Sequence, residues 1–375
     1  RQPVRRDRTM NTGSVKSAPQ PVPSDPHAEL LAQIKTRHPT HRSVWILFDP
    51  AMNPMYEDET SAAWLDLAER MPVQVAIPGY GLGVERCPLW LQADLTKPKG
   101  QQLLRASVEA ALDELHPDAL RRNNGRRVCA WVCSPPNAKS TPDALRAQAL
   151  HMAGLLVQTR PNLPTHYPYL NGRPVHVRLQ DPAVLWALWP LFNSMQKSQW
   201  LAHVGGWWML KPNGQMHALQ ALQADAPMHS PRAVPHALDM RFTPDQWTSV
   251  PHIQPLNHAL RKWLQRSLQD NPLAELADLD VDNARDGACA AIRTTDNAGW
   301  RDLIDLQAVA YYAMAYHPRF DTSTLIRNHL AQRMVAARKD DAAFDLAGWL
   351  HVLSASDWQR VVAQLNHVEP PAAVA

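Results

Sequence analysis

The apolar residues of this chain follow two alternating patterns before residue 250 and only one pattern after it. In the first part, short runs of Val, Ile, Leu and Trp alternate with helix-period segments, whereas the second part contains helix-period segments alone. Alternating strands and helices are typical of an α/β unit, and an unbroken series of helices is typical of an all-α unit. We therefore predict an α/β N-terminal lobe with a mixed sheet and an all-α C-terminal lobe. The 375 residues are enough for two such cores.

Local signals place the elements of the first lobe. A helix is predicted to begin near Ser140, because a hydroxyl cap, Pro142 in the first turn and the carboxylate of Asp143 all suit a helix N-terminus. A second helix follows Asp181 and Pro182 and carries a wide apolar stripe that another element must cover. Strands are predicted from short apolar runs at 43–49, 73–77, 89–93, 127–133 and 175–179.

Composition divides the chain into four segments. Residues 1–28 are rich in Arg, Ser and Pro without periodicity, which predicts a disordered tail, and Met10 within it is a candidate natural start. Residues 29–215 form the predicted α/β domain, residues 216–250 a connector rich in Ala, Pro and His, and residues 251–375 the helical lobe. Helices are predicted in that lobe at 254–269, 299–316, 322–338, 341–351 and 355–367, with Ser354 or Ser356 as the cap of the last.

Charge and cysteine content exclude several classes of protein. Lys and Arg number 38 against 35 Asp and Glu, so the net charge of +3 gives no overall attraction for nucleic acid or anionic lipid. No apolar run is long enough to span a membrane, and the basic N-terminus lacks a secretory signal. The cysteines have no zinc-ligand spacing and are expected to be reduced thiols of a cytoplasmic protein: Cys87, Cys129, Cys133 and Cys289.

The residue types that most often carry catalysis or bind metals form no recognisable motif. Residues 79–83 are glycine-rich but lack the spacing of a nucleotide-binding loop. His229 and His236 lie in the connector without a carboxylate at ligand spacing, and Ser134 is not in a nucleophile-elbow sequence. Paired acids such as those at 57–59 are typical of solvated faces and helix caps. We therefore expect no enzyme, no catalytic residue, no metal site and no cofactor.

The most distinctive segment runs from Arg173 to Leu185. In it a strand that contains Arg178 ends at Asp181 and Pro182 and turns directly into an apolar helix. It resembles the signature of the effector-chaperone (adaptor) family of bacterial type VI secretion, although Leu and Gln replace the family's aromatic pair and Ala follows the proline. Shorter matches to the family are Leu47 to Asp49 with Asn53 and Pro54, Cys87 to Leu91, Val132 to Ser134, and Gln199 to Trp207.

The resemblance implies an α/β lobe and a helical lobe that together bind a secreted effector and the spike protein that carries it, without ATP or a cofactor. For Arg178 two interpretations stay open. Either it faces the cargo, or its guanidinium bonds to Asp181, which also caps the following helix, and so fixes the strand-to-helix corner. Aromatic side chains often anchor protein interfaces, although most tryptophans here are expected in the core. The predicted partner-binding residues are Arg178, Asp181, Trp186, Trp189 and Trp207.

Two other functions are weighed against a non-catalytic adaptor. One is a hydrolase or toxin whose site is assembled near the Pro- and His-rich connector, with His and Asp groups brought together only by the fold. Toxicity on expression would distinguish it. The other is a structural scaffold subunit, which stable self-assembly without cargo would distinguish.

Overall fold

The structure is a computed structural model, and it describes residues 25–37, 42–52, 59–68, 71–77, 87–116, 118–119, 125–134, 142–161, 172–219, 240–270, 276–339 and 344–367. The predicted tail up to residue 24 and residues 220–239 of the predicted connector lie outside the described residues, as do residues 79–83.

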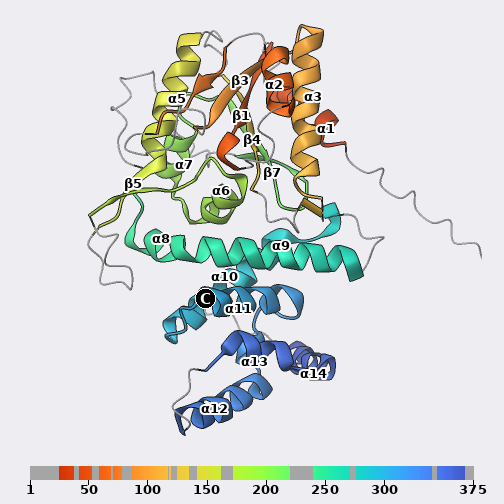
Figure 1. Ribbon diagram of the computed structural model, residues 1–375, viewed down its shortest axis with the longest axis vertical. Coiled ribbons are helices and arrows are strands. Elements are labelled where there is room, and N and C mark those ends of the chain that lie inside the picture. Colours follow the sequence, from red (N-terminus) through yellow and green to blue (C-terminus); the bar gives the residue numbers. More distant parts are fainter. Residues whose placement is uncertain are drawn as a thin grey trace, which may run out of the picture.

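A six-stranded sheet with the order β2-β3-β1-β4-β7-β8 forms the centre of the α/β part (Figure 1). Each pairing between its described strands is antiparallel. Apart from Ser43, the two central strands consist of β-branched, aromatic and other apolar residues. Both are buried along their whole length, as expected for strands covered on both faces. The strands are β1 (Ser43–Phe48), β2 (Val73–Gln74), β3 (Leu89–Asp94), β4 (Val128–Cys133), β7 (Gly206–Leu210) and β8 (Met216–Leu219).

Helices cover both faces of this sheet because successive side chains of a strand point to opposite sides. Val44 and Ile46 pack against α1 (Pro26–Arg37), α2 (Glu59–Leu67) and α3 (Pro98–Asp113). Trp45 and Leu47 pack on the other side, where the covering helices are α5 (Pro142–Leu156), α6 (Pro182–Leu188) and α7 (Ser194–Trp200). A separate two-stranded sheet joins β5 (Val157–Thr159) to β6 (Pro174–His176).

The helical part follows α8 (Pro244–Ser249) and begins with α9 (Ile253–Asp270), which lies across the lower end of the α/β part in Figure 1. The buried cluster that contains Trp45 and Leu47 continues into α9, α10 (Val281–Asn297) and α11 (Leu303–Ala315), through Leu260, Ile292 and Leu306 among others. One hydrophobic core therefore joins residues before 219 to residues after 253.

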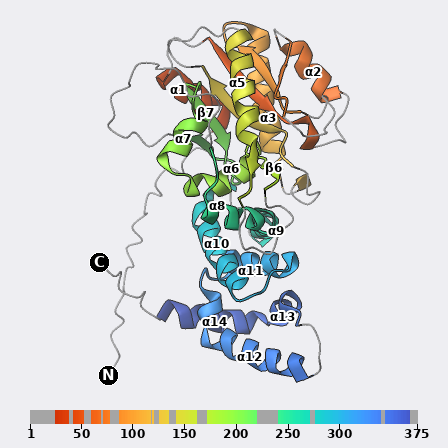
Figure 2. The ribbon, with the colours of Figure 1, turned by 90° about the vertical axis from the view of Figure 1, so that its left-hand side faces the viewer.

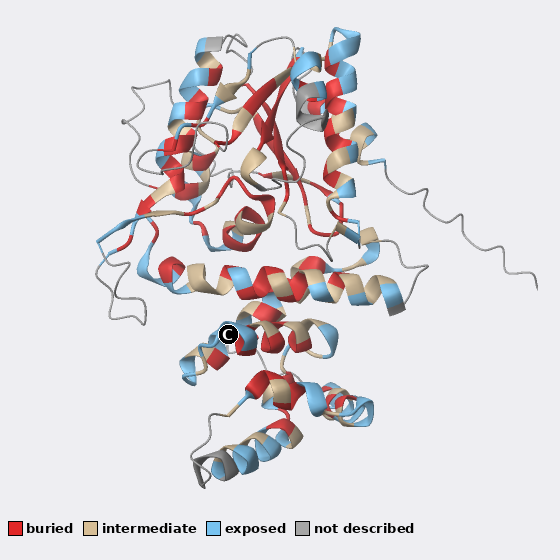
Figure 3. Ribbon diagram, in the orientation of Figure 1, coloured by how far each residue is buried: buried red, intermediate tan, exposed pale blue. Residues whose placement is uncertain are grey.

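The remaining helices lie at the far end of the molecule from the sheet (Figure 2). A second cluster packs the last turns of α11 against α13 (Leu346–Val352) and α14 (Ala355–His367). Of α12 (Thr324–Lys339), Ile326 is buried in this cluster, whereas most of its other described side chains are exposed (Figure 3).

The predicted fold class is confirmed: an α/β N-terminal part containing a sheet is followed by a helical C-terminal part. Several elements differ from the prediction. The run at 73–77 forms a strand only at Val73–Gln74, and the helix expected at 341–351 is α13, which begins at Leu346. The run at 175–179 contributes only its first residues to a strand, and this strand lies in the small sheet. Helix α10 was not predicted. At the ends of the predicted connector, residues 216–219 form β8 and residues 244–249 form α8, and the domain boundary itself stays a prediction.

Candidate functional site

Arg178 forms an ion pair with Asp49, the residue that follows β1. Its Nη2 lies 2.7 Å from Asp49 Oδ2, and Gln180 Nε2 donates to the same oxygen at 3.1 Å. The other oxygen accepts the backbone N–H of Ala51. The Asp49 side chain is 1 % exposed, and this burial raises its pKa above the ordinary value, against the opposing effect of Arg178. The charge of Arg178 is therefore used within the fold, although its side chain stays 30 % exposed.

Asp181 caps α6, as predicted. Its Oδ1 accepts the backbone N–H of Ala183 at 2.9 Å, and its own N–H donates to the carbonyl of Arg178. The predicted side-chain bond from Arg178 to Asp181 is replaced by the pair with Asp49. Because the carboxylate of Asp181 is already engaged by the helix N-terminus, the more deeply buried carboxylate of Asp49 has the greater need of a cation.

A second buried ion pair lies nearby at the start of β4. Arg127 Nε donates to Glu114 Oε1 at 3.0 Å, and both side chains are less than a tenth exposed. Burial raises the pKa of Glu114. The neighbouring Arg126 is buried and donates to the carbonyl of Leu210 at 2.8 Å. The sequence analysis did not identify Glu114, Arg126 and Arg127 as a cluster, because no pattern in the neighbouring sequence indicates that Glu114 faces β4.

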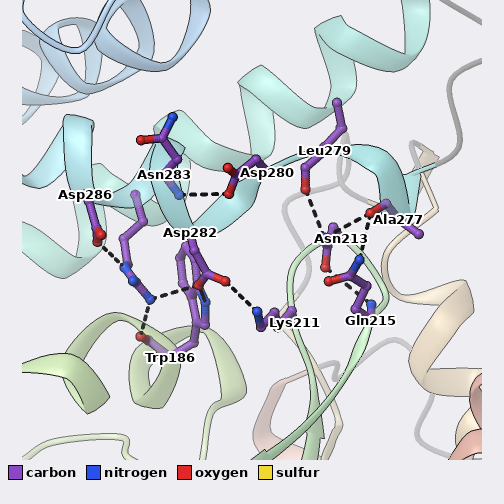
Figure 4. A network of polar contacts seen from close by, with 11 residues as sticks. Trp186, Lys211, Asn213, Gln215, Ala277, Leu279, Asp280, Asp282, Asn283 and Asp286 are labelled. Atoms are coloured by element: carbon purple, nitrogen blue, oxygen red, sulfur yellow. Dashed lines mark hydrogen bonds and ion pairs between the residues drawn. The ribbon is translucent and has the colours of Figure 1, made fainter.

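Trp186 lies at the junction of the α/β part and the helical part (Figure 4). Its side chain is 2 % exposed, and its Nε1 donates to Asp282 Oδ1 of α10 at 3.0 Å. The guanidinium of Arg285 lies over the indole, 4.7 Å from the ring centroid, and is 3.2 Å from Asp282. Lys211, at the end of β7, pairs with the other oxygen of Asp282. Asp282 therefore links α6, β7 and α10.

The turn between β7 and β8 adds a second set of contacts to this junction. Asn213 donates to the carbonyls of Ala277 and Leu279, at 3.4 and 2.9 Å, and Gln215 donates to the carbonyl of Ala277 at 2.9 Å. These bonds hold the segment before α10 against the sheet (Figure 4). The junction is thus polar at its edge and apolar in its centre, an arrangement that fixes the orientation of the two parts.

The two other predicted tryptophans have different surroundings. Trp207 is 1 % exposed on β7, with its ring centroid 6.0 Å from that of Trp90 and 5.1 Å from that of Trp200. Trp189, in the short helix η5 (Trp189–Leu191), is only partly buried, with Lys197 Nζ 5.6 Å from its ring centroid. As the side chains stand, Trp186 and Trp207 are covered by the chain itself, and Trp189 keeps a surface that a partner could contact.

A groove of about 810 Å³ opens at the β2 edge of the sheet. It lies between α2, β2, β3 and the start of α5, and most of the residues that line it are apolar. Met71, at its rim, is 87 % exposed, and Leu65 is 46 % exposed. Large apolar side chains that are exposed together, in a concave surface, are typical of a contact site for another protein. Sequence reasoning missed this groove because its residues come from four separate segments.

A smaller hollow, of about 180 Å³, lies at the junction between α6 and η5 on one side and α9 and α10 on the other. Its apolar wall includes Leu188, Leu191 and Leu256. Helix α10 contributes Arg285, Asp286, Cys289 and Arg293. We refer to it as the junction hollow.

Neither a metal-binding cluster nor a membrane-spanning helix is found in the described part of the chain. Among the described residues no group of three or more His, Cys, Asp and Glu side chains could hold a metal ion. His229 and His236 lie outside the described residues. None of the helices in the described ranges has both the length and the apolar composition that crossing a bilayer requires.

No family model matches this chain, and the chain matches neither a curated protein nor a solved structure. The resemblance to type VI adaptors therefore stays a prediction from short motifs, of which the segment from Arg178 to Leu185 forms the corner at Asp181 described above.

Proposed function

We propose that this chain is a non-catalytic adaptor or chaperone that binds a type VI secretion effector in the cytoplasm and delivers it to the spike protein. The observation that carries the proposal is the apolar groove at the β2 edge of the sheet, where Met71 and Leu65 are exposed. A chaperone needs a surface of this kind, because it holds apolar segments of its cargo away from water by reversible contact.

The character of the groove favours a protein partner over a small substrate. A substrate or cofactor site usually combines an apolar pocket with a few convergent polar groups whose pKa values are shifted. The polar side chains that line this groove are those of Gln74, Gln92 and Arg146. The carboxyl groups of Asp49 and Glu114, whose pKa values are raised by burial, are instead paired with arginines in the interior.

The thiols agree with a reducing compartment. Cys87, Cys129, Cys133 and Cys289 are free cysteines, and burial raises the pKa of Cys133 to about 12 and that of Cys289 to about 11. Thiols with raised pKa values are poor nucleophiles, so Cys133 and Cys289 suit packing better than redox chemistry.

The hydrolase or toxin alternative depends on the Pro- and His-rich connector. Residues 220–239 of that connector lie outside the described residues, and within the described ranges no feature favours this alternative.

The test is co-expression of the chain with any toxin-like protein that is encoded beside its gene, followed by affinity purification and measurement of soluble effector. Met71→Glu places a charge in the groove and is expected to lower effector recovery at least about tenfold, the effect of losing about 1.4 kcal/mol of binding. Leu150→Glu is the matched control: Leu150 is 75 % exposed on α5 and does not line the groove, so recovery should not change. Effector that is equally soluble with and without the chain would refute the proposal.

A further inference from the structure

The junction hollow combines an apolar wall with one uncompensated positive charge. Arg285 is paired with Asp282 and Asp286, at 3.2 and 2.9 Å, so its charge is balanced. His252 lies 3.1 Å from Asp296, and burial lowers its pKa, so it is mainly neutral at pH 7. Arg293 is exposed, and within the described part of the chain it makes no hydrogen bond or ion pair.

The charge of Arg293 acts on the hollow itself. Burial has the largest effect on the two titratable groups beside it, lowering the pKa of His252 and raising that of Cys289, and the charge of Arg293 acts on both of these lining residues. The hollow is also lined by Leu188, Leu191 and Leu256, of which Leu191 is 40 % exposed. An occupant that satisfies both sides has an apolar group and, next to it, a negative charge.

The size of the hollow limits what can enter. About 180 Å³ is smaller than the roughly 300–1,000 Å³ of ordinary small-molecule sites. It suits one side chain presented by a polypeptide, in the way that an interface anchor fills a pocket on its partner. Leu191, 40 % exposed at the rim, would contact the flanking backbone of such a segment.

We propose that the junction hollow is a second binding site, which accepts an apolar side chain of a partner protein whose neighbouring residue is acidic and pairs with Arg293. The site is separate from the groove at the β2 edge, and it spans α6 and η5 of the α/β part and α9 and α10 of the helical part. A partner bound there would contact both parts at once, and would therefore recognise the assembled molecule.

The test uses two model peptides that differ in one charge, acetyl-Gly-Phe-Asp-Gly-amide and the same peptide with Asn in place of Asp. Cys289 lines the hollow, so its alkylation by iodoacetamide, followed at pH 9 by peptide mass mapping of the purified full chain, reports occupancy. Ligand-observed NMR on the same samples measures binding directly. We expect the acidic peptide to bind about three- to fivefold more tightly than the neutral one and to slow alkylation of Cys289.

Two variants and one further ligand decide the outcome. Arg293→Gln should make the two peptides equal, whereas Arg333→Gln, on exposed α12, should leave their difference unchanged. Absence of binding by either peptide, or equal binding to the unmodified protein, would overturn the proposal. The proposal would also be overturned if free 3-phenylpropionate slowed alkylation of Cys289 and neither peptide did, because the site would then bind a small carboxylic acid and not a polypeptide. The assay contains no effector, so its result is independent of the co-expression test.

Discussion

The two parts of the molecule stabilise their interiors by different means. The α/β part buries charge, in the pairs Asp49 with Arg178 and Glu114 with Arg127. The far end of the helical part stacks aromatic rings: the Trp358 centroid lies 4.7 Å from that of Tyr312 and 4.4 Å from that of Tyr316, with nearly parallel planes. A sheet covered on both faces is thick enough to enclose ion pairs, whereas small helices rely on a few large apolar contacts.

This difference implies unequal local stability. The central strands β1 and β4 are buried throughout, but α12 is largely exposed and is held mainly near its first turns (Figure 3). Regions with few buried apolar contacts open at lower free energy than the core. We therefore expect the α12–α14 end to open before the sheet does.

Removing the central ring of the aromatic stack should have the largest effect. Trp358 is 2 % exposed, and Trp358→Ala is expected to lower the stability of the far helices by about 4 kcal/mol, through lost burial and the cavity left behind. Hydrogen exchange should show loss of protection in α13 and α14, with β1 and β4 unchanged. Val352→Ala, at a side chain that is 74 % exposed, is the control. Equal loss of protection in both parts would mean that the two parts unfold together.

Breaking the buried pair tests the other part. Arg178→Ala should lower the free energy of unfolding by about 3 kcal/mol, because it leaves Asp49 buried without its cation. Arg173→Ala, an exposed arginine of the same segment, should change little.

The same variant has a defined pH dependence. Burial already raises the pKa of Asp49 above its ordinary value of 3.8, so the folded state holds this proton to higher pH than the unfolded state does. Stability from this group therefore falls as pH rises from 3.8 through the raised pKa. Loss of Arg178 raises that pKa further, so the deficit of Arg178→Ala should be larger at pH 7.5 than at pH 4.5 in urea denaturation. A deficit independent of pH would exclude Asp49 as its cause.

A weaker change at the junction should sharpen the contrast between the parts. Asp282→Asn weakens the contacts with Lys211 and Arg285 and is expected to cost about 2 kcal/mol. With the link weakened, the urea transition should broaden as the two parts unfold more independently. The control is Asp286→Asn, whose carboxylate is 69 % exposed and pairs with Arg285, for which we expect about 0.5 kcal/mol or less. Identical urea transitions for Asp282→Asn and Asp286→Asn would show that Asp282 does not link the two parts.

The smallest effect is expected at the last helix. Ser354 Oγ accepts the backbone N–H of Asp357 at 3.2 Å and bonds to the Asp357 carboxylate, so it is the cap of α14. Ser354→Ala should cost about 1 kcal/mol, and Ser356→Ala, one position inside the first turn, distinctly less. Thermal unfolding followed by circular dichroism measures both. A larger loss of stability for Ser356→Ala than for Ser354→Ala would contradict the assignment of Ser354 as the cap of α14.

Elements with local signals were predicted closely from the sequence. The strand expected at 43–49 is β1, and the helix expected at 355–367 is α14 with the same limits. Helix α10 was missed because Ala, Thr, Asn and Asp fill most of it, with few large apolar residues to reveal a period. The cap at Asp181 was predictable, since a cap acts on the residues that follow it.

The partners across the site were not predictable in the same way. Arg178 contacts Asp49 over a separation of 129 residues, and Trp186 contacts Asp282 over 96. Pairings of this kind depend on strand order and helix packing, which no local pattern specifies. When strand order is unknown, the simplest prediction pairs Arg178 with the neighbouring capping residue Asp181. The sequence also could not show that Trp186 faces α10 whereas Trp189 keeps an exposed surface.

The shared core that runs from the sheet into α9, α10 and α11 has a consequence for how this chain could be divided. A backbone cut between residues 219 and 240 would break a covalent connection but leave Leu260, Ile292 and their neighbours packed against the α/β part. Each half expressed alone would present that apolar surface to water and would tend to aggregate. Expressed together, the two halves should reassemble, so the protein is a natural candidate for a split pair whose reconstitution reports that both fragments are present.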